Sequence, residues 1–376
     1  MSQGLAHHIP PDPLPGVAPL DTTATAPAPA FPRHFAAVAR REDLLLKLIV
    51  LAATPLVSLL IFVKYLPDYA VLTPTPAPLS SYAVYWEHMH GIEPFRARFA
   101  SNYAYYYAAK AIEAFIRIPG DPRIHPLRLS AALVTSVCLW LVTLPLLLDR
   151  RRDWDWRIFY TGLLIVSFFA LYQFNPSDFP SLVFVSMGLV FLLNKQRVLA
   201  MVALLVCGLF RESNIHIAWF AVSMLIIPRL SVGIGWAAAY VVAFLAEWWV
   251  IRKVVFKVGG NDVWMVIKIN LASPTAWTMV ALVLCLAALA YVVVAARRAR
   301  ARARGETPDP LDTFFLIQVL WVPVWLVFYL FAGSNWTEFR VQLPTLLPLV
   351  YALAYRPRED QVSEVTSVPS KSVIYG

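Results

Sequence analysis

Long apolar segments separated by short polar connections dominate the chain between residues 43 and 355. A helix needs about 20 mostly apolar residues to cross a bilayer, and most of these segments approach or exceed that length. The pattern therefore predicts an all-α, polytopic membrane protein with about ten membrane-spanning helices. The predicted spans are residues 43–64, 127–148, 158–174, 179–194, 198–210, 215–228, 232–251, 275–296, 313–332 and 341–355.

The composition agrees with this interpretation. Hydrophobic residues make up 59% of the 376 residues and charged residues only 15%, whereas about a quarter of the residues in soluble proteins are charged. The net charge of +9 does not indicate a nucleic-acid partner, because cytoplasmic connections of membrane proteins are rich in Lys and Arg. All three cysteines lie within apolar segments, which favours packing over a disulfide framework.

The chain divides into three regions. Residues 1–42 form a Pro/Ala-rich tail that we predict to be disordered. Residues 43–355 form the membrane domain, and residues 356–376 form a second tail. Basic sequences flank the membrane domain on both sides ("RHFAAVARREDLLLK" and "RPRED"), so we predict that both tails are cytoplasmic. We expect a multi-pass protein of the cell membrane, the inner membrane if the source is bacterial.

The distribution of arginine predicts which side of the membrane each connection faces. The connections at 149–157, 195–197, 228–231 and 297–312 would be cytoplasmic, and the arginine run in the last of these is the clearest marker. The first extracytoplasmic loop would span residues 65–128 and carry an interfacial helix near 101–118. The remaining outer connections are 175–178, 211–214, 252–274 and 334–340. Most of the acidic and amide side chains would therefore converge on the outer face.

Residues 198–228 are largely apolar, and the charged residues among them are Arg211 and Glu212. A single helix over this stretch would be about 46 Å long and would place both charges near the middle of the membrane. We predict two short helices hinged at Arg-Glu-Ser-Asn, which keeps the basic connections on one side. With a single helix here, all connections before it, or all connections after it, would face the opposite side of the membrane.

Four sequence motifs follow one another along the chain. Asp68 follows the first span at the start of a long loop, and that loop contains "YAVYWEHMHGIEPFRAR". An Asp-led span begins at "NPSD" and is followed by a short basic turn and a span ending in "FRESN". The last span begins with "NWTEFRVQLPTLLP". Together these motifs resemble the GT-C superfamily of polytopic glycosyltransferases, over most of residues 43–355.

The resemblance implies inverting transfer of a sugar from a polyprenyl-phosphate donor to a glycan or lipid acceptor of the cell envelope, without a cofactor. A carboxylate would accept the acceptor's proton, and Asp68 is the first candidate with Glu87 as the alternative. Arginines would stabilise the leaving phosphate; the candidates are Arg96, Arg98, Arg211 and Arg340, with Arg252 and Lys253 as further choices. Side chains that would orient these arginines or bind sugar hydroxyls are Glu212, Glu338 and Asp178.

Other interpretations remain open from the sequence. Arg211 with Glu212, and Glu338 with Arg340, are also suited to structural ion pairs, while Asp178 is suited to capping a helix. His88, His90 and His125 could ligate a divalent metal together with nearby acids, but no spacing matches a known metal site, so the prediction is a site without metal. A transporter or flippase for a lipid-linked sugar, a polysaccharide polymerase or ligase, and a non-catalytic assembly protein are the competing functions.

Overall fold

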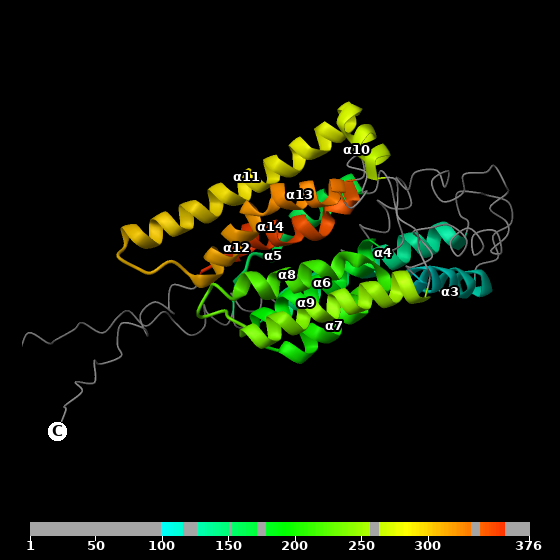
Figure 1. The fold of residues 1–376 in the computed structure, drawn as a ribbon, viewed down its shortest axis with the longest axis horizontal. Helices are drawn as coiled ribbons and strands as arrows, with labels where there is room; N and C mark the ends of the chain where they lie inside the picture. Colours follow the sequence, from blue (N-terminus) through cyan, green and yellow to red (C-terminus); the bar gives the residue numbers. More distant parts are fainter. Residues whose placement is uncertain are drawn as a thin grey trace, which may run out of the picture. The chain divides into compact units, whose positions relative to one another are not determined.

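The structure is a computed structural model, and in it the described residues are helical almost throughout (Figure 1). This confirms the predicted helical class. One departure is an antiparallel pair of two-residue strands, β1 (Asp153–Trp154) and β2 (Tyr355–Arg356). The described residues are 99–115, 126–149, 152–170, 178–255, 263–331 and 339–357. The predicted tail 1–42, the span 43–64, most of the loop 65–128 and most of the tail 356–376 lie outside them.

Most of the described helices begin or end within a few residues of a predicted span. The α-helices are α3 (Phe99–Phe115), α4 (Pro126–Leu148), α5 (Trp156–Ala170), α6 (Asp178–Leu193), α7 (Arg197–Phe210), α8 (Ile215–Met224), α9 (Ile234–Trp249), α10 (Val263–Ala272), α11 (Pro274–Ala303), α12 (Pro310–Leu320), α13 (Val322–Phe331) and α14 (Leu343–Ala354). The shorter turns are the 3-10 helix η5 (Glu212–Asn214), the π-helix η6 (Val250–Val255) and the 3-10 helix η7 (Phe339–Gln342).

Three helical stretches in the described part of the chain are long and apolar enough to cross a membrane. They are Ile234–Val255, Pro274–Ala303 and Pro310–Phe331. The first joins α9 to η6, and the third joins α12 to α13 across Trp321. Six further apolar helices of 10–17 residues accompany them. By length and composition, the bundle is suited to a lipid bilayer.

Two predicted connections differ from the structure. The arginine run was predicted to lie in a connection beginning at residue 297, but α11 continues as helix to Ala303. Alanine and arginine are both strong helix formers, so the alternating Ala-Arg sequence extends the helix beyond its apolar part. The predicted connection 252–274 contains α10, whose apolar residues are interrupted by Lys268 and Asn270.

Helix α6 lies at the centre of the described bundle and contacts α4, α7, α8 and α14. Its apolar residues surround the whole helix, and Leu182, Val185 and Leu189 are almost fully buried. A helix that is hydrophobic on every side belongs in an interior position. In contrast, α9 and α11 leave large apolar side chains such as Leu245 and Leu289 exposed, as helices facing lipid do.

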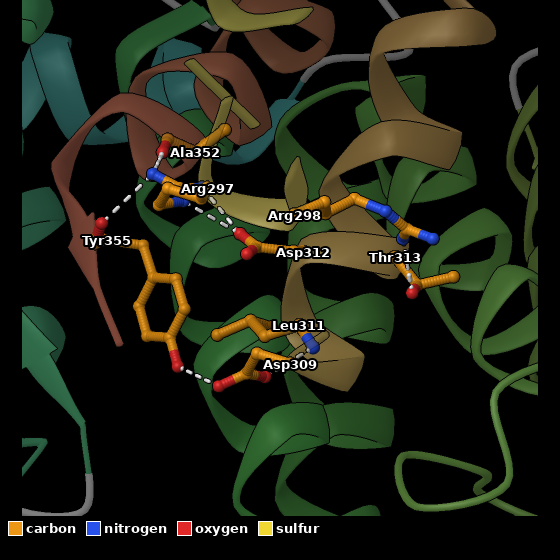
Figure 2. A network of polar contacts seen from close by, with 8 residues as sticks. All are labelled: Arg297, Arg298, Asp309, Leu311, Asp312, Thr313, Ala352 and Tyr355. Atoms are coloured by element: carbon orange, nitrogen blue, oxygen red, sulfur yellow. Dashed lines mark hydrogen bonds and ion pairs between the residues drawn. The ribbon is translucent and has the colours of Figure 1, made fainter. Parts of the chain in front are cut away.

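Arg297 joins three helices, α11, α12 and α14, at one end of the bundle (Figure 2). Its guanidinium pairs with Asp312 of α12 at 2.7 Å. The same group donates hydrogen bonds to the carbonyl oxygens of Ala352 and Tyr355, at 2.8 and 3.0 Å, at the end of α14. Beside this contact, the Tyr355 hydroxyl donates to Asp309, the residue that caps α12.

A second arginine fastens the same end of the bundle. Arg152 pairs with Asp149 at 3.0 Å and donates to the carbonyl oxygen of Leu193 at 2.6 Å, at the end of α6. Close by, Asp153 and Arg356 are opposite each other in the strand pair, and Arg356 also pairs with Asp155. We call this region the arginine end. The helix termini around it are held by charged side chains rather than by apolar packing alone.

We expect Arg297→Ala to destabilise the protein by about 3 kcal/mol, because it leaves the buried Asp312 carboxylate without its guanidinium partner. The melting temperature of the purified protein in detergent should fall by roughly 5 °C. Arg300→Ala is the matched control, since Arg300 lies on the same helix with an exposed side chain, and its melting temperature should match the wild type. Equal melting temperatures for both variants would contradict the structural role of Arg297.

Candidate functional site

The candidate site is built around the break between α7 and α8. Helix α7 ends at Phe210, and Arg211 has extended backbone with φ −166° and ψ 158°. The N–H of Arg211 still donates to the carbonyl oxygen of Cys207 at 2.9 Å. A single 3-10 turn, η5, then leads into α8. The prediction of two helices in residues 198–228 is therefore confirmed, with the hinge at Arg-Glu-Ser-Asn.

The Arg211 guanidinium pairs with the carboxylate of Asp178, the first residue of α6. Both residues are buried, with exposed fractions of 8% and 2%. An unpaired charge would be strongly unfavourable in such a place, so each side chain makes the burial of the other tolerable. The ion pair fixes the end of α7 against the start of α6.

A second ion pair joins the hinge to the end of α9. Glu212 accepts from Arg252 of η6 at 2.8 Å, and the two side chains are 30% and 26% exposed. Because this pair is partly in solvent, it contributes less to stability than a buried pair and opens at lower cost. Arg252, the further choice for binding phosphate, is therefore part of the same cluster as Arg211.

Glu247 of α9 also belongs to this cluster, although it lies within an apolar segment and was not predicted. The amide of Asn214 donates to its carboxylate at 2.8 Å. The same carboxylate lies against Gly208 of α7, where an added Cβ would come within 3.0 Å of it. The lone acidic residue in the segment 232–251 was the available sequence signal for this position.

These side chains surround a cavity of about 10 Å³, which is roughly the space for one water molecule. We call the group the hinge cluster; its residues are Gly208, Arg211, Glu212, Asn214, Glu247, Trp248, Ile251 and Arg252, with Asp178 behind Arg211. Its own carboxylates fill the space beside its arginines. An anionic ligand would have to replace one of these carboxylates. Glu212 is the easiest to replace, because it and its partner Arg252 are both partly exposed.

A buried histidine lies two residues beyond the hinge, in the first turn of α8. His216 shares a 2.7 Å hydrogen bond with the hydroxyl of Tyr329 on α13, and its ring lies 4.3 Å from the ring of Trp325. These contacts hold α8 against α13. Sequence reasoning missed this network, because its members are far apart along the chain and each is ordinary within an apolar helix.

The structure brings together only some of the predicted site residues. Asp178, Arg211, Glu212 and Arg252 lie in one cluster, as the predicted convergence of the connections 175–178, 211–214 and 252–274 requires. Arg340 lies in η7, and the structure describes its backbone but not its side chain. Lys253 lies in η6 with an exposed side chain and does not line the cavity of the cluster. The remaining predicted residues, Asp68, Glu87, Arg96, Arg98 and Glu338, lie outside the described residues.

The hinge cluster combines two guanidinium groups with three carboxylates, those of Asp178, Glu212 and Glu247. Each guanidinium is paired with one carboxylate and offers a planar set of donors that matches phosphate or carboxylate oxygens. Among the described residues, no group of three His, Cys, Asp or Glu side chains is placed to hold a metal ion. An oxygen-rich anion bound by either arginine would have to displace one of the cluster's carboxylates.

We expect Gly208→Ala to displace the Glu247 carboxylate, because an added Cβ would overlap it. The carboxylate is the far end of a flexible side chain and can move aside, so the main loss is its hydrogen bond with Asn214. That loss costs about 1 kcal/mol, and the melting temperature in detergent should fall slightly. Gly235→Ala on α9 is the control, since nothing lies within 4 Å of its added Cβ. If both variants melt with the wild type, the close contact between Gly208 and Glu247 is not formed.

No protein-family model matches the chain, and no curated protein or solved structure matches it either. The likeness of its motifs to the GT-C superfamily therefore stays a prediction drawn from residues 43–355. The chemistry of the hinge cluster is the remaining guide to function. That cluster combines a buried and a partly exposed arginine at a break between apolar helices.

Proposed function

We propose that the protein is an integral membrane glycosyltransferase with about ten membrane-spanning helices, which transfers a sugar from a polyprenyl-phosphate donor to a glycan or lipid acceptor. The observation that carries this proposal is the hinge cluster. Two arginines and their carboxylate partners, from α6, the α7–α8 hinge and η6, gather at one place within an apolar bundle. Charged groups inside a membrane domain are costly to place and are a hallmark of functional sites.

The distribution of charge supports an extracytoplasmic location for this site. Helices α6 and α7 each have one terminus in the hinge cluster, at Asp178 and Phe210. Their other termini, at Leu193 and Arg197, are next to the basic turn and the contacts of Arg152. Because basic connections stay in the cytoplasm, the arginine end faces the cytoplasm and the hinge cluster faces outward.

In the proposed reaction, the acceptor hydroxyl oxygen attacks the anomeric carbon of the donor sugar. The bond from that carbon to the phosphate oxygen breaks, and polyprenyl phosphate leaves with the electron pair. The hydroxyl proton passes to a carboxylate, for which Asp68 and Glu87 remain the candidates. The configuration at the anomeric carbon inverts, and no metal or nucleotide takes part.

The two arginines of the hinge cluster have different roles in this proposal. Arg252 binds the donor phosphate, which takes the place of the partly exposed Glu212 carboxylate. Arg211 stays paired with the buried Asp178 and fixes the hinge that carries Glu212. Arg96, Arg98 and Arg340 are further candidate phosphate ligands, and Glu338 is a candidate for orienting Arg340.

A flippase for a lipid-linked sugar is the second candidate, favoured by the broken helix at Arg211. Transporters often place their binding sites at discontinuous helices, and α7 and α8 form such a pair. The two functions differ in chemistry, since a flippase leaves the bond between sugar and phosphate intact. Release of free polyprenyl phosphate therefore separates them.

We expect Arg252→Ala to lower sugar transfer by about 100-fold, the usual effect of removing one donor that stabilises developing charge. The assay uses membranes supplied with radiolabelled polyprenyl-phosphate hexoses and pentoses and follows release of polyprenyl phosphate. Arg229→Ala is the control, because Arg229 is exposed in the turn after α8 and outside the hinge cluster. Full activity of a folded Arg252→Ala protein would contradict the assignment of Arg252.

The proton acceptor is tested in the same assay. One of the two carboxylates is the base, and its amide variant, Asp68→Asn or Glu87→Gln, should reduce transfer by at least 100-fold without changing the melting temperature. If the folded variants both transfer sugar at the wild-type rate, neither residue is the base. If no donor in the panel is cleaved but a labelled donor crosses the membrane of proteoliposomes, the flippase function replaces the transferase.

A further inference from the structure

An apolar groove of about 360 Å³ opens between α5, α11 and α14, and no residue of the hinge cluster lines it. This volume is at the lower end of the range of about 300–1,000 Å³ that is typical of small-molecule sites. Leu346, Leu349 and Leu353 line it from α14, and Leu286 and Leu289 line it from α11. The walls therefore offer only apolar side chains along most of the groove.

The third wall is one face of α5. Arg157, Thr161 and Ile165 line the groove at successive helical turns. At a rise of 1.5 Å per residue, they span about 12 Å along the helix axis. An added Cβ at Gly162 would lie 3.0 Å from the Val350 side chain, so the glycine lets α5 pack closely on α14. The groove is thus elongated and runs along the helices.

Among the described residues that line the groove, Arg157 alone is charged, and it lies at the arginine end. Its guanidinium is 5.4 Å from the centre of the Trp156 ring. Within the part of the chain that the structure describes, it forms no ion pair. The neighbouring Asp155 carboxylate is engaged elsewhere, since it accepts the N–H groups of Arg157 and Ile158 at the start of α5 and pairs with Arg356.

We propose that this groove binds one acyl chain of an anionic glycerophospholipid, whose phosphate pairs with Arg157. The groove has the direction of a lipid chain in a bilayer, and its charged residue lies at one end, where a headgroup would be. Trp156 is suited to the same depth, because tryptophan favours the membrane interface. The site belongs to the leaflet on the arginine end, and basic residues there attract anionic lipids.

This site is separate from the proposed sugar transfer and needs only the bilayer. Its ligand is a structural or regulatory lipid rather than the donor. The bound acyl chain would fill the space between α5, α11 and α14. Lipid binding and loss of transferase activity are therefore measured independently, and failure of one proposal leaves the other standing.

The experiment is native mass spectrometry of the full-length protein in detergent, titrated with phosphatidylglycerol or phosphatidylcholine of the same acyl chains. We expect one phosphatidylglycerol to bind at least fivefold more tightly than phosphatidylcholine, and Arg157→Gln to remove that preference. Arg157→Lys keeps the charge and should keep the preference. Arg302→Gln, which removes an exposed charge outside the groove on α11, should behave as the wild type.

The apolar part of the groove is tested by a substitution that fills it with a larger side chain. Leu289→Trp places a large side chain in the groove from a position that is 51% exposed, and both lipids should bind more weakly. Leu284→Trp, at an exposed position of α11 outside the groove, is the control. Equal binding of the two lipids by the wild type would overturn the proposal, as would unchanged binding by folded Arg157→Gln and Leu289→Trp proteins.

Discussion

The buried ion pair between Arg211 and Asp178 is the constraint on which the candidate site depends. A guanidinium buried in an apolar bundle needs a partner that offsets its lost hydration, and here that partner is a carboxylate at the start of the neighbouring helix. The pairing requires α7 to end where α6 begins. At Arg211 the chain leaves the helical conformation of α7, and Glu212 and Asn214 then lie opposite α9 and η6. One interaction thus fixes both the break and the composition of the hinge cluster.

The two polar regions of the bundle use arginine in different ways. At the arginine end, Arg152 and Arg297 donate to backbone carbonyl groups of helix termini as well as to carboxylates, and so they join helices. In the hinge cluster, Arg252 has a single partly exposed carboxylate partner among the described residues. The first arrangement is suited to stability. The second is suited to exchange of the carboxylate for an anionic ligand, on which the proposed function rests.

The helical class and the break at Arg211 could be predicted from the sequence because each has a local cause. Apolar length predicts helices, and two adjacent charges in an apolar stretch predict an interruption. The partner of Arg211 could not be chosen among the candidate acids, since the pairing depends on how α6 packs against α7. Glu247 was missed because its environment is set by Gly208 and Asn214 on other helices. The helical arginine run after residue 296 was mistaken for a loop because charge outweighed helix propensity in the prediction.

Equilibrium binding of polyprenyl phosphate, the leaving group of the proposed reaction, tests the central claim most directly. The measurement compares the detergent-solubilised wild type with Arg252→Ala and with Arg229→Ala. The account predicts saturable binding to the wild type, unchanged binding to Arg229→Ala, and binding to Arg252→Ala weakened by about tenfold, since a charge-assisted contact to phosphate is lost. Equal affinity for all three folded proteins, or no binding to the wild type, would contradict it.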